Sequence, residues 1–394
     1  MKALADVLRV FGPAGAVRNR AVIHAIAREW RERNFRQVGL IAREAARERP
    51  DDHDLALLLA RLHREGLCPF SEVRTALERH DTSRARVALV DFLWLRCHVE
   101  EAAAVARGAA DRVGTRALTR FAALLHALGA SDEAMETLKR AKRAPDFALY
   151  PRGYIRLMGE AYRRGIDRSP IARRALPIDE RLARDEGQMR QRLAACGGST
   201  AIVANGPLPP MTGARIDAHG CIVRMNRHGL YRHAPSRKFG PDALGTGFDV
   251  WFRPAERTLV PLLEPVPPHI VLTGACIADR FASGVALLEP FMTLDTTIEQ
   301  VPVAIYRDLF HRFDAVPSVG ALALACVADA TGPLSPEQVF GFAPSRNTQA
   351  TSLHRTGTVS GRKPNRHRWD IEAAYLRDVT GGTATPAGAP AIEA

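Results

Sequence analysis

The stretch from Thr200 to Arg227, TAIVANGPLPPMTGARIDAHGCIVRMNR, decides how the second half of this chain is expected to fold. It begins with a short apolar run that ends in Asn205-Gly206-Pro207, a pattern typical of a strand followed by a tight turn. A second strand is predicted from Gly220 to Asn226. Nucleotides bind at strand ends of open parallel sheets. An asparagine amide there is suited to contact a base or ribose, because it both donates and accepts hydrogen bonds.

Beyond this stretch, short β-rich runs such as residues 270–273 and 302–305 alternate with helical segments. This alternation predicts an α/β domain with a mostly parallel sheet over residues 199–380. The last residues, 381–394, are small and rich in Pro and Gly, and we expect them to be disordered.

In the first part of the chain the apolar residues recur with a helical spacing and not in the short strand-like runs of the second half. Residues 1–145 are predicted to be helical, with a break at Arg49-Pro50-Asp51-Asp52 and with similar helix openings spaced roughly as in the 34-residue tetratricopeptide hairpin. Such hairpins stack because none buries its apolar face alone. The array is expected either to support the second domain or to dock a partner protein or an acceptor polymer. Residues 146–198 are expected to be a helical connector.

Three motifs, in order, resemble those of the eukaryotic-type sialyltransferases, glycosyltransferase family 29. Asn205-Gly206, Ile216-Asp217-Ala218-His219 and Arg224-Met225-Asn226-Arg227 are similar to the large sialylmotif. Pro317-Ser318-Val319-Gly320, followed by Val339-Phe340-Gly341-Phe342, resembles the small motif. His367 and Glu372 match the His-x4-Glu pattern of the very small motif, and His354 stands where the family's third motif has a His or Tyr.

The resemblance covers residues 199–380 and implies a Rossmann-like, GT-A-variant domain of a sialyltransferase of bacterial type. It implies that Asn205, Gly206 and Asn226 contact the CMP of a CMP-sugar donor, and that Ser318, Val319 and Gly320 meet its carboxylate or phosphate. His367 would be the general base for the acceptor hydroxyl, since imidazole titrates near neutral pH. His354 would contact the leaving phosphate, or Arg355 would supply the charge instead.

Several residues have structural alternatives. The carboxylate of Glu372 is expected to orient local structure or a backbone amide, and Ser318 is also a standard helix N-cap. Asp217 and Arg224 are expected to be structural, and Gly245-Thr246 resembles the family's Gly-Thr. Val319 replaces a Ser or Thr and Pro207 replaces a small residue in the family pattern.

No metal is implied, because the donor carries one phosphate. The one Asp-x-Asp sequence, Asp52-His53-Asp54, is interpreted as helix-start chemistry. The six cysteines form no CxxC pair, and Thr200 and Thr331 stand where animal relatives have a disulfide. A shifted bridge between Cys196 and Cys326 remains an alternative to small buried thiols.

The 394 residues carry a net charge of +12. This excess suits an anionic nucleotide-sugar or an anionic lipid leaflet, although an arginine-rich codon usage explains it equally well. A nucleic-acid partner is not expected, because aromatic residues make up only 6% and do not interleave with the basic runs. No apolar run reaches the length of a membrane span, and no signal peptide is predicted. We expect a cytoplasmic protein, in peripheral contact with the inner membrane if its acceptor lies there.

The sequence thus predicts an inverting, metal-independent glycosyltransferase that moves an acidic sugar from CMP to a glycan or glycolipid hydroxyl. Two alternatives stay open. The donor sugar could be Kdo rather than sialic acid, since both are acidic 2-ulosonic sugars. The chain could also be an inactive helical-repeat adaptor, although a relic would not be expected to keep His367, Asn205 and Asn226 together.

Overall fold

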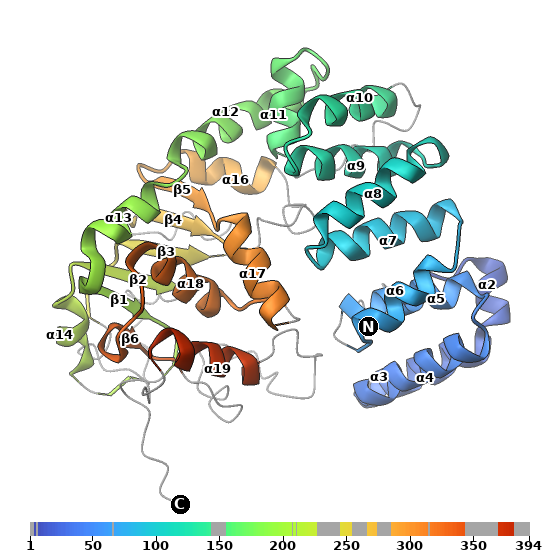
Figure 1. Ribbon diagram of the computed structural model, residues 1–394, viewed down its shortest axis with the longest axis horizontal. Coiled ribbons are helices and arrows are strands. Elements are labelled where there is room, and N and C mark those ends of the chain that lie inside the picture. Colours follow the sequence, from blue (N-terminus) through green and yellow to red (C-terminus); the bar gives the residue numbers. More distant parts are fainter. Residues whose placement is uncertain are drawn as a thin grey trace, which may run out of the picture. The chain divides into compact units, whose positions relative to one another are not determined.

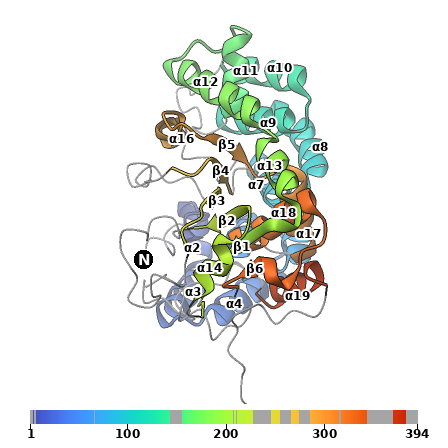
Figure 2. The same ribbon diagram turned by 90° about the vertical axis from the view of Figure 1, so that its left-hand side faces the viewer.

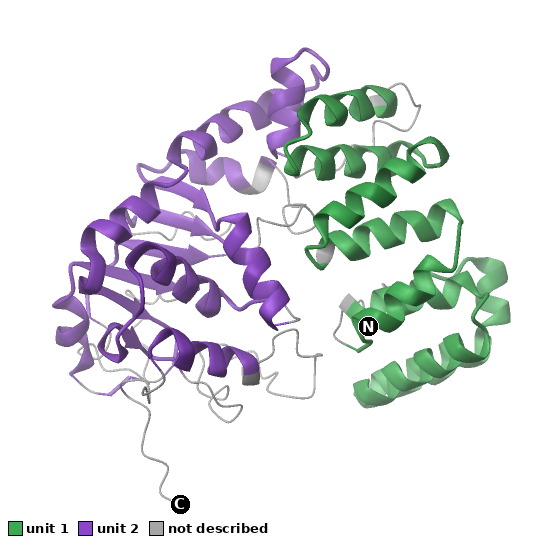
Figure 3. Cartoon of the chain, viewed as in Figure 1, with its two compact units in different colours: residues 1–151, 358–366 green, residues 152–357, 367–394 purple. Residues whose placement is uncertain are grey.

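The computed structural model describes most of the chain in two compact units, which are treated one by one (Figure 3). The described residues are 4, 7–64, 67–142, 155–206, 208–209, 211–226, 245–253, 266–273, 285–313, 316–342 and 369–381. Residues up to 142 belong to the first unit and those from 155 onward to the second. No helix among these residues is both long and apolar enough to cross a membrane.

The first unit is helical, as predicted (Figure 1). Successive helices pack as hairpins, α3 on α4, α5 on α6, α7 on α8 and α9 on α10, and each hairpin touches the next. The break predicted at 49–52 separates α4 from α5. The helices are α2 (Pro13–Arg18), α3 (Arg20–Glu32), α4 (Phe35–Glu48), α5 (His53–Arg64), α6 (Phe70–Glu78), α7 (Ser83–Leu95), α8 (Val99–Ala109), α9 (Thr115–Ala127) and α10 (Ser131–Lys142).

The second unit is built on a six-stranded parallel sheet, in the order β5-β4-β3-β2-β1-β6. The strands are stacked in this order in Figure 2. They are β1 (Thr200–Val203), β2 (Cys221–Met225), β3 (Val250–Arg253), β4 (His269–Leu272), β5 (Thr297–Gln300) and β6 (Val339–Phe340). The chain steps in one direction from β1 to β5 and then returns to place β6 beside β1. Ligands of open α/β sheets bind at the carboxyl edge, at such a reversal of strand order.

Helices cover both faces of this sheet, which explains why its strands read as continuous apolar runs. Ile222 on β2 packs in one cluster with Ile216 of helix α14 (Thr212–Asp217). Met225, three residues on and therefore on the opposite face, approaches Gly320 in helix α18 (Val319–Thr331). The other helices of this unit are α11 (Ile155–Arg163), α12 (Pro170–Asp185), α13 (Gln188–Cys196), α16 (Val285–Met292), α17 (Val303–Phe313) and α19 (Trp369–Val379).

The strand expected at 302–305 is wrong, because this run opens helix α17. The buried residues of α17 are Tyr306, Leu309, Phe310 and Phe313, which recur with the helical period of three and four. The β-branched residues at its start resemble a strand only in a short window. The edge strand β5 lies just before it, at 297–300.

The segment 146–198, expected as a connector, supplies helices α11 to α13 to the second unit. The buried carboxylate of Asp185 accepts a hydrogen bond from the backbone N–H of Ile298 at 2.9 Å. Glu299 on β5 accepts from the backbone N–H groups of Gly187, at 2.7 Å, and Met189. These two carboxylates join α12 and α13 to the edge strand, so the segment is part of the α/β core.

Candidate functional site

Strand register brings three polar side chains to the carboxyl edge of the sheet. Val203 on β1 is in register with Arg224 on β2, and Arg224 with Trp251 on β3. Counting two residues on from these registered pairs gives Asn205 and Asn226, just past the ends of β1 and β2, and Arg253, the last residue of β3. Neighbouring strands lie about 4.8 Å apart, so the three positions span about 10 Å. We call Asn205, Asn226 and Arg253 the edge row.

The first member of the row is fixed by β6. The backbone N–H of Ala204 donates to Phe340 O and that of Gly206 to Gly341 O, both at 2.8 Å, so pairing continues past the end of β1. Gly341 has φ +66, and a Cβ there would stand 2.8 Å from the carbonyl oxygen of Ala204. Oδ1 of Asn205 is buried and has no hydrogen-bond partner within the described part of the chain.

Asn226 is held in the left-handed region, with φ +56. Its backbone N–H donates to Phe252 O at 2.9 Å, and its carbonyl oxygen accepts from Nε1 of Trp251 at 2.8 Å. Asn is among the few residues that tolerate this conformation. Both backbone groups are thus satisfied by β3, and no hydrogen bond of the side-chain amide is seen within the described part of the chain.

The amino terminus of α18 lies beside the edge row. Oγ of Ser318 accepts the N–H of Ala321 at 3.1 Å, which makes Ser318 the N-cap. A Cβ on Gly320 would lie 3.1 Å from the Phe342 ring and 3.6 Å from Sδ of Met225. Ser318, Val319 and Gly320 therefore begin their helix against the carboxyl ends of β2 and β6. The first N–H groups of a helix have no intrahelical acceptor and favour anions.

Glu372 on α19 holds this helix start in place. Its carboxylate accepts the backbone N–H of Ser318 at 3.0 Å, which is the backbone contact expected for it. Burial raises the pKa of Glu372 to about 7, and the hydrogen bonds from Ser318 only partly oppose that shift. The carboxyl group is thus poised to gain or lose its proton near neutral pH.

Asp217 and Arg224 have structural contacts, as the sequence suggested. Nε of Arg224 donates to Gly247 O at 2.7 Å, and Asp217 accepts from the backbone N–H groups of Thr246 and Gly247. Burial acts to raise the pKa of Asp217, but these hydrogen bonds and the charge of Arg224 outweigh it and lower the pKa. The Gly245-Thr246 turn is therefore tied to the end of α14.

Two predicted residues, His354 and His367, lie outside the described residues. The site that the structure brings together consists of Asn205, Gly206, Asn226, Ser318, Val319, Gly320 and Glu372, with Arg253 and Gly341 added. Sequence reasoning placed Gly341 in the small motif but gave it no role in the site, and it did not single out Arg253. A signal for Arg253 was present, because it ends an apolar strand.

The only metal-ligand cluster among the described residues is Asp52-His53-Asp54 in the first unit. Its carboxylates are engaged elsewhere: Asp52 pairs with Arg18 at 3.1 Å, and Asp54 with Arg84 at 3.1 Å. Oδ1 of Asp52 also accepts the N–H of Asp54 at 3.1 Å at the start of α5. This is the helix-start role expected from the sequence.

Cys196 and Cys326 are free thiols, as are the other three cysteines of the described part. Sγ of Cys196 lies 3.7 Å from the carbonyl oxygen of Gly220. The shifted disulfide between Cys196 and Cys326 is therefore not formed in this structure.

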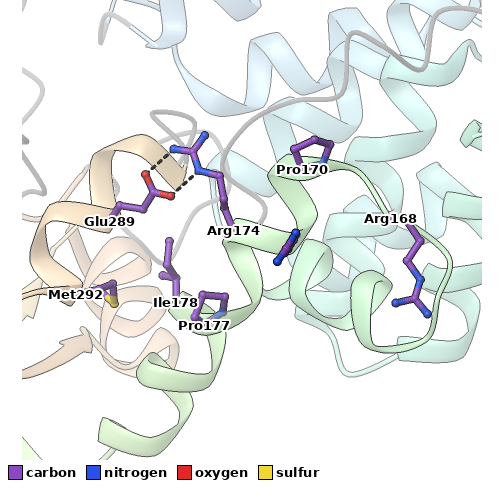
Figure 4. Close-up of a pocket in the computed structure, with 8 residues that line it drawn as sticks. Arg168, Pro170, Arg174, Pro177, Ile178, Glu289 and Met292 are labelled. Atoms are coloured by element: carbon purple, nitrogen blue, oxygen red, sulfur yellow. Dashed lines mark hydrogen bonds and ion pairs between the residues drawn. The ribbon is translucent and has the colours of Figure 1, made fainter.

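A hollow of about 560 Å³ lies between α12 and α16 (Figure 4). Arg174 and Glu289 form a two-point ion pair across it, drawn with dashed lines in Figure 4. Its other lining residues are Arg168, Pro170, Arg173, Pro177, Ile178 and Met292. None of them belongs to the edge row or to the start of α18, so this hollow is separate from the motif residues.

The chain was compared with models of protein families, with curated proteins and with solved structures, and no match was found in any of the three.

Proposed function

We propose that this chain is an inverting glycosyltransferase that transfers an acidic sugar from a CMP-sugar donor to a hydroxyl of a glycan or glycolipid. One observation carries the proposal. Asn205, Asn226, Ser318–Gly320 and Glu372 are far apart in sequence, yet they meet at the carboxyl edge of a parallel sheet beside the strand-order reversal. This edge is where such sheets bind nucleotides.

The residues at this edge suit the parts of a nucleoside monophosphate. The amides of Asn205 and Asn226 can donate to and accept from a base or ribose, and the buried Oδ1 of Asn205 lacks a donor among the described residues. The N–H groups of Val319 and Gly320, which have no intrahelical acceptor, suit the phosphate and would bind the charge that grows on the leaving CMP. A single phosphate bound in this way needs no metal.

The proton chemistry is assigned to the two histidines by the family resemblance. In this proposal His367 removes the acceptor proton and His354 contacts the leaving phosphate. His367 comes two residues before α19, the helix whose Glu372 binds Ser318. The same short segment would therefore link the base to the phosphate-binding turn.

The test is calorimetric titration with CMP, with UDP and GDP as controls, followed by assays of CMP release from CMP-sialic acid and from CMP-Kdo. Selective CMP binding and release of CMP from one donor, unaffected by EDTA, are expected. Selective binding without turnover of either donor would favour an inactive adaptor, and preference for UDP or GDP would refute the proposed donor class.

A further inference from the structure

Arg253 completes the edge row, although no motif of the resembling family includes it. It ends β3 and pairs in register with Leu272 on β4, so its place is fixed on both sides of the strand. Asn226 is level with it on the neighbouring strand, and the backbone N–H of Asn226 donates to Phe252, the residue before Arg253. The guanidinium is therefore carried at the same edge as the two asparagines.

The charge of Arg253 is held by the same ring that holds Asn226. Its guanidinium carbon lies 5.6 Å from the centre of the Trp251 ring, and Nε1 of Trp251 donates to Asn226 O. Arg253 is 2% exposed and Trp251 is fully buried. An arginine keeps its proton even there. A fixed charge shielded from water acts on a neighbouring group far more strongly than one on the surface.

Arg224 is a second buried arginine of this sheet, and it lies two residues further from the edge than Arg253. Its charge faces Asp217, whose pKa it helps to lower, and its Nε binds the Gly247 carbonyl. Arg224 is explained by its role in tying the 245–247 turn to α14. Arg253 stands further along, at the edge itself, beside Asn226.

We infer that Arg253 is the specificity residue that makes this edge select an anionic ligand, by fixing a positive charge for the phosphate of the bound nucleotide. The inference rests on the proposed function and deepens it. The start of α18 offers backbone N–H groups to the phosphate from the face that Met225 occupies. Arg253 and Trp251, two residues apart on β3, lie on the other face, so the phosphate would be held between backbone donors and a full charge.

The experiment compares CMP with cytidine, which lacks only the phosphate, by calorimetry on the full chain. The wild type is expected to bind CMP at least about tenfold more tightly than cytidine. Arg253→Met should remove most of that difference by weakening CMP alone, whereas Arg253→Lys, which keeps the charge, should retain part of it.

The matched control is Arg192→Met. Arg192 contacts Gly220 O at 3.1 Å and Asp249 at 3.2 Å, which directly precede β2 and β3. The Arg192→Met substitution therefore removes one positive charge at the opposite end of the same two strands. Both affinities should remain at the wild-type values, because the charge lies at the far edge of the sheet.

Each other outcome overturns the inference. If Arg253→Met binds CMP like the wild type, or weakens CMP and cytidine equally, Arg253 does not select the phosphate, and the proposed function still stands. If the wild type binds CMP no more tightly than cytidine, the inference fails whether or not the variants fold. If the wild type binds neither, both the inference and the proposed function fail.

Discussion

Asn226 combines two demands on a single residue, a left-handed backbone and an amide at the edge row. Gly adopts φ +56 without strain, whereas Ala pays about 1 kcal/mol or more. Asn226→Gly should therefore keep the melting temperature closer to wild type than Asn226→Ala, while both weaken CMP binding at least about tenfold. Thermal melts and calorimetry on the pair separate backbone from side chain. Unchanged CMP affinity in the Gly variant would remove the amide from the site.

Glu372 should make stability depend on pH in a defined direction. Its ordinary pKa is 4.5 and burial raises it to about 7 in the folded protein. The folded state therefore holds this proton more tightly. The resulting stabilisation is complete below about pH 4.5 and is lost as the pH rises through 7.

A glutamine at position 372 cannot titrate, so the stability of Glu372→Gln relative to the wild type should increase between pH 5 and 8. The expected increase in the free energy of unfolding is about 1–3 kcal/mol. Urea denaturation at several pH values measures it. Glu337→Gln, at an exposed position of the same unit, controls for loss of a carboxylate. Parallel pH profiles for Glu372→Gln and the wild type would show that Glu372 is not the titrating group.

Strand-end position and the motif resemblance singled out Asn205, Asn226, Ser318 and Glu372, and the structure brings these residues to one edge of the sheet. Their part in binding a nucleotide stays a prediction. That reasoning did not single out Arg253, although it ends an apolar strand. Its significance comes from the register of β1, β2 and β3, and register is a property of pairs of strands rather than of one segment.

The carboxyl edge of the sheet depends on the pairing of β1 with β6. Gly341, at φ +66, allows its backbone to approach Ala204 O and to accept from Gly206. Gly341→Ala should cost about 1–3 kcal/mol, because a methyl group adds a clash to the backbone strain.

Gly187, in the same unit, provides the comparison for that substitution. It has φ +88 and ψ −8, and no atom lies within 4 Å of a Cβ placed there, so Gly187→Ala should cost only the left-handed backbone strain. Chemical denaturation of both variants gives the difference. Equal losses would mean that the close approach of β6 to β1 contributes nothing beyond the conformation of Gly341.

Element boundaries were less predictable than element types. The helical first part and the parallel sheet follow from periodicity, which is local. The run at 302–305 was misassigned because four residues cannot distinguish a strand from a helix whose apolar face appears only over the next turns. The role of 146–198 was hidden because the carboxylates of Asp185 and Glu299 each accept from a backbone N–H more than a hundred residues away in the sequence.

At the scale of the whole molecule, the unit boundary predicts which part of the chain folds alone. A chain beginning at Arg152 keeps α11 to α13 and should fold and bind CMP like the full protein. A chain beginning at Ser199, the boundary suggested by sequence, leaves Glu299 buried without its backbone partners and should fail to fold cooperatively. Circular dichroism melts and calorimetry compare them. Equal stability would show that the three helices α11 to α13 are dispensable.

The central claim is that distant segments form one CMP site at the carboxyl edge of the sheet. Hydrogen exchange of the full chain, with and without saturating CMP, tests it most directly. Exchange should slow together in peptides covering 201–206, 221–226 and 316–322, and stay unchanged in the helices of residues 13–142. Slowing at the hollow between α12 and α16, with none in those three segments, would contradict the account.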